Sequence, residues 1–130
     1  MVDLFAADVL GRFGLKPART AGHSYGEYVA LAVAGLNDRA DLLRLSALRG
    51  QAVHEAGRNC PGGMAAVAAP EERTRQALAE LGIEAAIANI NGPSQTIIGG
   101  NVACIDAALR RLPEQGLAVQ RIAVSAAFHT

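Results

Sequence analysis

The chain has 130 residues, which is enough for one ordinary domain with a sizeable core. Its 12 acidic and 12 basic residues balance, so its charge does not indicate a nucleic-acid partner. No apolar run approaches the roughly 20 residues of a membrane span, and the start lacks a signal-peptide pattern. The two cysteines, Cys60 and Cys104, have neither metal-site nor disulfide-framework spacing. These features predict a soluble, cytoplasmic protein that binds no metal, membrane or nucleic acid.

Three helices and one short strand are expected in the first 60 residues. The first helix covers residues 2–13 and ends at Gly14, a residue type that favours the left-handed conformation beyond a helix end. Its apolar stripe comprises Val2, Phe5, Ala6, Val9 and Phe13. A strand is expected at residues 18–21 and a second helix at 25–34. The third helix starts near residue 39 and is expected to end at Gly57.

The pattern changes after Pro61-Gly62-Gly63. Strand-like segments are expected at residues 64–69, 83–90, 95–98 and 117–124, and helices at 71–81 and after Asn101, which suits an N-cap. The resulting order, β-α-β-β-α-β, is that of ferredoxin-like folds. The first part, with one strand, cannot complete a sheet. We therefore expect part of an α/β layer with a small ferredoxin-like insertion, and a chain that is a fragment.

A G-x-S-x-G pattern, Gly22-His23-Ser24-Tyr25-Gly26, lies between the expected strand and the second helix. In a nucleophile elbow, this pattern makes a sharp turn that exposes the serine hydroxyl. The following helix then directs its unpaired N–H groups and positive dipole end toward the reacting oxygen. The alternative is a serine that only caps a helix. We favour Ser24 as a nucleophile for acyl groups.

A serine nucleophile needs a base, and the chain has three histidines. The side chain of His23 is expected to point away from Ser24, because neighbouring side chains at a tight turn diverge. His54 falls on the polar face of its helix. His129 follows the last expected strand, and strand ends beside a cleft are common places for catalytic groups. His129 is therefore the leading candidate for the base.

Arg49 lies in the middle of an apolar stripe of the third expected helix. The other members of the stripe are Leu42, Leu45, Ala52, Val53 and Ala56. A buried guanidinium is costly unless an anion pairs with it. One interpretation is a structural ion pair or a side chain that reaches solvent at the edge. The other is a two-pronged site for a substrate carboxylate.

Asn89 and Asn91, which precede Pro93, are explained by turn formation, with contact to an active site as the alternative.

Five ordered motifs resemble the acyltransferase family, which includes malonyl-CoA:acyl-carrier-protein transacylases and the acyltransferase domains of polyketide and fatty acid synthases. The motifs are Gly22-His23-Ser24-Tyr25-Gly26-Glu27, Leu48-Arg49-Gly50, Gly62-Gly63-Met64-Ala65-Ala66-Val67, Asn91-Gly92-Pro93-Ser94-Gln95-Thr96 and Ala127-Phe128-His129. The resemblance spans nearly the whole chain. It implies a partial α/β-hydrolase-like subdomain at residues 1–60, a ferredoxin-like subdomain at 61–124, and a return to the first subdomain at 125–130.

The resemblance also implies roles for the matching residues. Ser24 would take the acyl group from a coenzyme A thioester, and His129 would be its base and would then act on the phosphopantetheine thiol of an acyl carrier protein. The backbone N–H of Tyr25 would donate to the oxyanion. Arg49 would bind the free carboxylate of a malonyl-type unit and thereby exclude plain acyl groups. Phe128 resembles the malonyl-selecting form of its motif, and Asn91 would contact substrate.

Further features of the resemblance concern the subfamily and the missing parts. Ala126 departs from the histidine common in modular malonyl domains, whereas Tyr25 and the ending 125–130 resemble iterative synthases of the enediyne or polyunsaturated fatty acid type. The second oxyanion donor of the family would lie before Met1, and the groups that orient the histidine would lie after Thr130. The partners implied are malonyl-CoA, an acyl carrier protein and neighbouring synthase domains, with no bound cofactor.

Two other functions fit parts of the pattern. A serine esterase or thioesterase would use water as the acceptor, but it normally places an Asp or Glu at a strand end between Ser and His. Asp106 is expected within a helix and Glu84 within the insertion, and a hydrolase gives Arg49 no role. The other alternative is a non-catalytic ferredoxin-like binding module in which Ser24 is only a cap.

Overall fold

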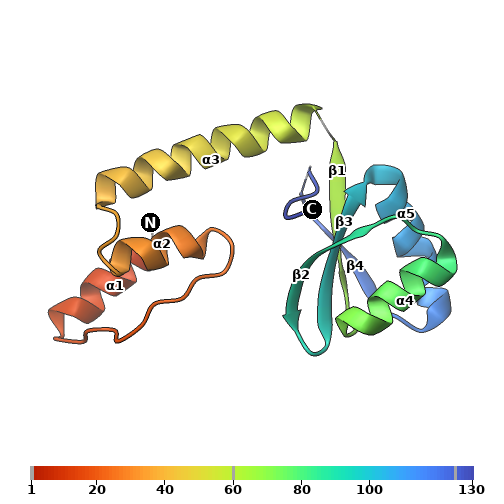
Figure 1. Ribbon diagram of the computed structural model, residues 1–130, viewed down its shortest axis with the longest axis horizontal. Helices are drawn as coiled ribbons and strands as arrows, with labels where there is room; N and C mark the ends of the chain where they lie inside the picture. The colour runs from red at the N-terminus through yellow and green to blue at the C-terminus, as the bar shows by residue number, and fades with distance from the viewer. Residues whose placement is uncertain (1, 60, 125) are drawn as a thin grey trace. The chain divides into compact units, whose positions relative to one another are not determined.

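The structure is a computed structural model that describes residues 2–59, 61–124 and 126–130. It divides into two compact units, Met1–Ala52 and Val53–Thr130. Figure 1 shows that the first unit is helical and that the second contains a β-sheet with helices packed on it. None of the helices in the described part of the chain is long and apolar enough to cross a membrane.

The first unit is built from α1 (Val2–Arg12), α2 (Gly26–Val33) and the part of α3 (Arg39–Asn59) that ends at Ala52. One buried residue from each helix forms its core; these are Leu4, Val29 and Leu42. The start of α3 is capped by Asp38, whose side chain accepts a hydrogen bond from the N–H of Asp41 at 2.7 Å. The three core side chains pack α2, which follows the G-x-S-x-G pattern, with α1 and α3.

Three expectations for this region are wrong. Residues 18–21 do not form a strand, because all strands that the described residues form lie between 62 and 122 and none pairs with this segment. The third helix continues through Gly57 to Asn59; a glycine inside a helix costs only about 1 kcal/mol relative to alanine and does not by itself end the helix. Pro61, soon after the last turn, is the stronger stop signal.

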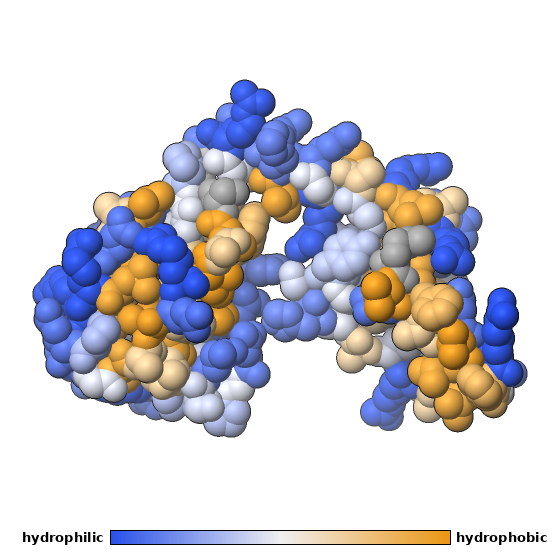
Figure 2. Space-filling model, turned by 180° about the vertical axis from the view of Figure 1, so that it is seen from behind, coloured by the Kyte–Doolittle hydropathy of each residue, from blue (hydrophilic) through white to orange (hydrophobic). Residues whose placement is uncertain are grey.

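The third error concerns the apolar stripe of α1. Val2, Phe5 and Phe13 are 67–80% exposed, and Leu4 is the buried residue of the helix. α1 has apolar residues on more than one side, so its periodicity did not determine which side would pack on α2. Figure 2 shows the resulting apolar surface over the α1 end of this unit.

The second unit contains a four-stranded antiparallel sheet of order β2-β3-β1-β4. Its elements are β1 (Gly62–Val67), α4 (Glu71–Leu81), β2 (Ala86–Gly92), β3 (Gln95–Asn101), α5 (Val102–Arg111), a 3-10 turn (Leu112–Gln115) and β4 (Val119–Ile122). The expected β-α-β-β-α-β order is confirmed. Asn101 caps α5 as expected, because its side chain accepts from the N–H of Cys104 at 2.8 Å.

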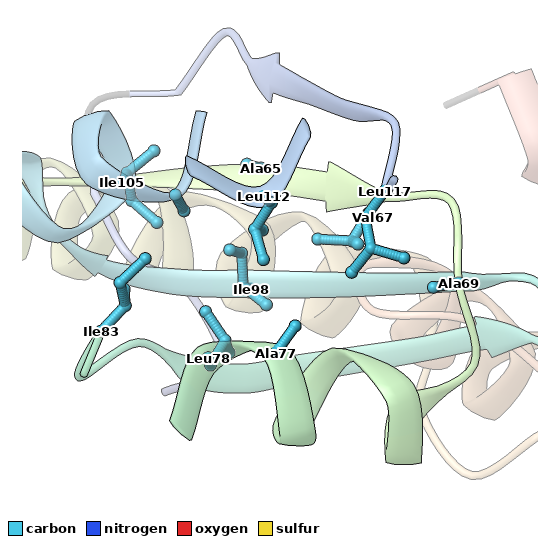
Figure 3. Close-up of a cluster of buried hydrophobic side chains, with 11 residues drawn as sticks. Ala65, Val67, Ala69, Ala77, Leu78, Ile83, Ile98, Ile105, Leu112 and Leu117 are labelled. Carbon is cyan, nitrogen blue, oxygen red and sulfur yellow. The ribbon is translucent and has the colours of Figure 1, made fainter. Parts of the chain in front are cut away.

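One apolar core holds the sheet to its helices. Figure 3 shows side chains of β1 and β3 meeting those of α4 and α5 between the sheet and the helix layer. Val67, Ile98, Ile105 and Leu112 have no exposed surface there. Alternation along β1 directs Gly63, Ala65 and Val67 toward this core and Gly62 to the opposite face of the sheet.

Candidate active site

Ser24 lies at a sharp turn with a left-handed backbone, φ +54°. The turn enters α2 through hydrogen bonds from the N–H of Gly26 to the carbonyl of His23 and from the N–H of Glu27 to the carbonyl of Ser24. Gly22 passes so close to the start of α2 that a Cβ on it would lie 2.1 Å from the carbonyl carbon of Gly26. The absence of a side chain at Gly22 therefore permits the close approach that makes the turn sharp.

Among the described residues other than glycine, Ser24 and His129 are the ones with positive φ, +54° and +60°. A left-handed conformation costs an L-residue roughly 1–2 kcal/mol. Such strain persists where the surrounding structure imposes it, and it is concentrated at functional sites. The two strained residues are the two that the sequence favoured as candidate nucleophile and candidate base.

Arg49 extends from α3 to the hydroxyl of Ser24, to which its Nη2 donates a hydrogen bond at 3.1 Å. Its guanidinium carbon also lies 5.7 Å from the ring centre of Tyr25 and 5.9 Å from that of Tyr28. Within the described residues, no carboxylate lies within 4.0 Å of the Arg49 guanidinium. The structural ion pair considered from the sequence is thus not formed, and the half-buried cation is held by aromatic rings and a hydroxyl.

A second contact joins the elbow to α3. The Tyr25 hydroxyl and Ser46 Oγ are 2.6 Å apart, and Ser46 Oγ donates to the carbonyl of Leu42 at 2.7 Å. Since the single hydroxyl hydrogen of Ser46 is used in that bond, Tyr25 donates to Ser46. Tyr25, the residue after Ser24, is therefore anchored on the helix that carries Arg49.

His129 lies in a tight turn at the end of the second unit. Thr130 Oγ1 donates to the carbonyl of Ala127 at 2.9 Å and closes this turn around the exposed His129. The turn lies against the face of the sheet opposite the helices, where a Cβ on Gly62 would come within 2.9 Å of the Ala127 nitrogen. Phe128, which is half-buried, lines a cavity of about 300 Å³ between this segment and the sheet, together with Gly62 and Asn101.

The other residues considered from the sequence lie elsewhere. Asn91 is exposed near the end of β2, where its amide donates to the Gln95 side chain at 2.9 Å across the hairpin. His23 and His54 are exposed, and Cys104 is a half-buried free thiol on α5. Cys60 lies outside the described residues. No group of three or more metal-ligating side chains occurs within the described ranges.

The sequence reasoning did not identify Tyr28 and Ser46 as parts of this site. Tyr28 is three residues after Tyr25 at the start of α2, and Ser46 is three residues before Arg49 on α3. Residues three apart on a helix share a face. The spacing therefore indicates that Tyr28 lies on the same face as Tyr25, and Ser46 on the same face as Arg49. It does not indicate that the two pairs contact each other.

Comparisons with known proteins show the family of this chain. The acyl transferase domain family matches residues 1–130. The chain is 38% identical over 119 residues to the spectinabilin polyketide synthase system protein NorA′ of Streptomyces orinoci, covering 90% of this chain and 3% of that protein.

Two solved structures are also similar. The acyltransferase domain of an iterative polyketide synthase in enediyne biosynthesis has a TM-score of 0.88 at 33% identity, and the match covers 98% of this chain and 34% of that one. For malonyl CoA-acyl carrier protein transacylase from Burkholderia pseudomallei, the TM-score is 0.86 at 34% identity, and the coverage is 98% and 43%. The chain thus spans less than half of either structure. With its whole length matched, this chain belongs to the acyl transferase domain family.

Proposed function

We propose that the protein containing this chain transfers a malonyl-type unit from coenzyme A to the phosphopantetheine thiol of an acyl carrier protein, through an ester on Ser24. The observation that carries the proposal is the pairing of a strained elbow serine with a guanidinium 3.1 Å from its hydroxyl. Transfer of a plain acyl group needs a nucleophile, a base and an oxyanion donor, but no cation beside the serine. An arginine beside it, without a carboxylate partner among the described residues, suits a substrate that brings its own carboxylate.

The proposed reaction has two balanced halves. Ser24 Oγ attacks the thioester carbonyl while His129 takes the hydroxyl proton, and the Tyr25 N–H donates to the oxyanion. When the C–S bond breaks, His129 returns the proton to the departing coenzyme A thiol, which leaves a seryl ester. The carrier-protein thiol then attacks this ester, its proton passes to His129, and the proton returns to Ser24 Oγ as the new thioester leaves.

The proposal includes a finer description of the fold. Residues 61–124 would be a ferredoxin-like subdomain, a description that the β-α-β-β-α-β order and the antiparallel sheet order β2-β3-β1-β4 support. Residues 1–60 and 125–130 would belong to an α/β-hydrolase-like subdomain. The elbow before α2 supports this assignment.

Substrate selection would depend on Arg49, Phe128 and Asn91. Arg49 would bind the malonyl carboxylate, and Phe128 would limit the space beside the α-carbon, which favours malonyl over branched units. Asn91 has the weakest support, because its amide bonds to Gln95 in the hairpin. Neighbouring synthase domains are proposed partners, consistent with the similarity to the polyketide synthase protein named above.

Replacing Arg49 by alanine tests the proposed function. In the full-length protein, we expect R49A to lower kcat/KM for malonyl transfer about 10–100-fold, because hydrogen bonds to a charged group contribute about 1.5–3 kcal/mol. Acetyl transfer should change much less. Seryl-ester formation from malonyl-CoA and acetyl-CoA, followed by intact-protein mass spectrometry, gives both rates.

The matched control for R49A is Arg44→Ala on the same helix. Arg44 is exposed and pairs with Asp41. R44A should keep the ratio of malonyl to acetyl rates. An unchanged ratio in R49A would remove the carboxylate argument.

A pair of neighbouring glycines tests the placement of His129. A Cβ on Gly62 would lie 2.9 Å from the backbone of both Ala127 and Gly100, so Gly62→Ala must displace the turn that holds His129. We expect seryl-ester formation to slow about 10–100-fold, because a misplacement of about 1 Å has an effect of this order.

In contrast, a Cβ on Gly63 would point to the helix side, 3.4 Å from the flexible end of Arg121. Gly63→Ala should therefore stay within about threefold of wild type, since its nearest neighbour is able to move. Equal rates in the two variants would contradict a role for this turn in placing the base.

Hydrolysis is the competing reaction. Asp106, a candidate third member of an esterase triad, lies within α5 and bonds to Arg121, which does not support that role. Faster hydrolysis of simple aryl esters than malonyl transfer to a carrier protein would favour an esterase. Absence of any ester on Ser24 would instead favour the non-catalytic ferredoxin-like binding module, in which Ser24 is only a helix cap.

A further inference from the structure

We infer that Tyr28, together with Tyr25, forms a cradle that positions the Arg49 guanidinium, and that Tyr28 is therefore a specificity-determining residue for carboxylated acyl groups. The inference rests on the proposed function, in which Arg49 binds the substrate carboxylate. Tyr28 does not need to touch the substrate. It acts by fixing where the guanidinium lies.

The cradle is defined by the contacts of two neighbouring rings with the same cation. The guanidinium carbon of Arg49 is 5.7 Å from the Tyr25 ring centre and 5.9 Å from the Tyr28 ring centre, within the distance at which a ring attracts a cation. The two rings are 6.0 Å apart and tilted by 42°. The Ser24 hydroxyl accepts from Nη2 at 3.1 Å. Three residues at the elbow and the start of α2 thus hold one arginine of α3.

Aromatic rings are a suitable support for an arginine that must receive a carboxylate. A carboxylate partner would use the N–H donors of the guanidinium and neutralise its charge. A ring attracts the cation through its π face and leaves the N–H groups at the edge of the guanidinium available. The cradle therefore restricts a long, flexible side chain and still presents the forked donor set that a malonyl carboxylate matches.

Ser46 completes the arrangement by fixing the first ring. Its hydroxyl donates to the Leu42 carbonyl at 2.7 Å and accepts from the Tyr25 hydroxyl at 2.6 Å. Ser46 precedes Arg49 by about one helical turn on α3. The Tyr25 ring is consequently tied to the same helix face from which Arg49 extends.

Tyr28→Leu and Tyr28→Phe separate the ring from the hydroxyl. The measurement, on the full-length protein, is the ratio of kcat/KM for malonyl-CoA to that for acetyl-CoA in ester formation at Ser24. Tyr28→Leu should lower this ratio roughly threefold to thirtyfold, the range that a ring–cation contact supports. Tyr28→Phe keeps the ring and should keep the ratio. A ratio that falls equally in both variants would overturn the cradle.

Two further variants keep the test decisive if Tyr28→Leu folds poorly. Ser46→Ala releases the Tyr25 hydroxyl and should lower the same ratio by a smaller factor. In an Arg49→Ala background, Tyr28→Leu should lower the ratio no further, because the group it positions is gone. An equal additional loss in that background would show that Tyr28 acts independently of Arg49.

The cradle and the proposed function fail in different ways. If wild type forms no ester on Ser24, or Arg49→Ala leaves the ratio unchanged, the proposed function fails and the cradle fails with it. If both of those results are as expected and neither Tyr28→Leu nor Ser46→Ala changes the ratio, only the cradle is wrong.

Discussion

Replacing Ser24 by alanine is expected to abolish the malonyl ester and to lower transfer to the carrier protein at least 10³-fold. Removal of a covalent nucleophile eliminates the two-step route, and only binding and the oxyanion donor remain. Intact-protein mass spectrometry after incubation with malonyl-CoA detects the ester directly. Peptide mapping then assigns it to a residue.

Ser94→Ala is the matched control, because Ser94 is an exposed serine in the β2–β3 hairpin turn. It should retain the full ester signal. A malonyl adduct that persists in Ser24→Ala would show that another residue is the nucleophile.

Ser24→Gly separates the chemistry from the backbone. Glycine adopts the observed φ of +54° without the penalty that alanine has, so this variant should have a free energy of unfolding about 1 kcal/mol higher than that of Ser24→Ala, which lacks the same hydroxyl, while forming no ester. Urea denaturation measures the difference. A gain in stability with complete loss of the ester would show that the strain at Ser24 serves function.

The sequence predicted those parts of the fold that local chemistry determines. Asn101 was identified as a helix cap, and its side chain makes the expected bond to the Cys104 N–H. The β-α-β-β-α-β order followed from alternating apolar patterns separated by turn residues. The G-x-S-x-G spacing indicated a sharp turn, and the left-handed φ of Ser24 agrees with it.

Features that depend on tertiary contacts could not be predicted in the same way. The pattern of α1 indicated a helix but placed Phe5 on the packed side, whereas Leu4 packs and Phe5 is 67% exposed. A strand was expected at residues 18–21 because a nucleophile elbow follows a strand, but a strand also needs a neighbour to pair with. The contact of Arg49 with the rings of Tyr25 and Tyr28 brings together residues that are far apart in the sequence. It depends on how α2 and α3 pack, which a local sequence pattern does not indicate.

The elbow itself depends on Gly22, and its replacement by alanine should have the largest effect on folding. The new Cβ would lie 2.1 Å from the Gly26 carbonyl carbon and 2.3 Å from the Glu27 nitrogen, both backbone atoms at the start of α2. The turn must open to relieve these contacts. We expect a loss of about 3 kcal/mol or more in the free energy of unfolding, at the upper end of overpacking effects.

Gly26→Ala is the matched control at the other glycine of the same pattern. A Cβ there meets no atom within 4 Å, and Gly26 is the first residue of α2. Alanine should therefore keep or raise stability by up to about 1 kcal/mol, because it is the better helix former.

Gly22→Ala should lower both the free energy of unfolding, measured in urea, and the rate of ester formation on Ser24, whereas Gly26→Ala should lower neither. In Gly22→Ala, the opened turn displaces the hydroxyl from the Arg49 guanidinium, so the ester should form at least 100-fold more slowly even in the fraction that folds. If Gly22→Ala were as stable and as fast as Gly26→Ala, the close approach would not be needed to hold Ser24 in place. The left-handed serine would then have to be imposed by contacts outside the elbow.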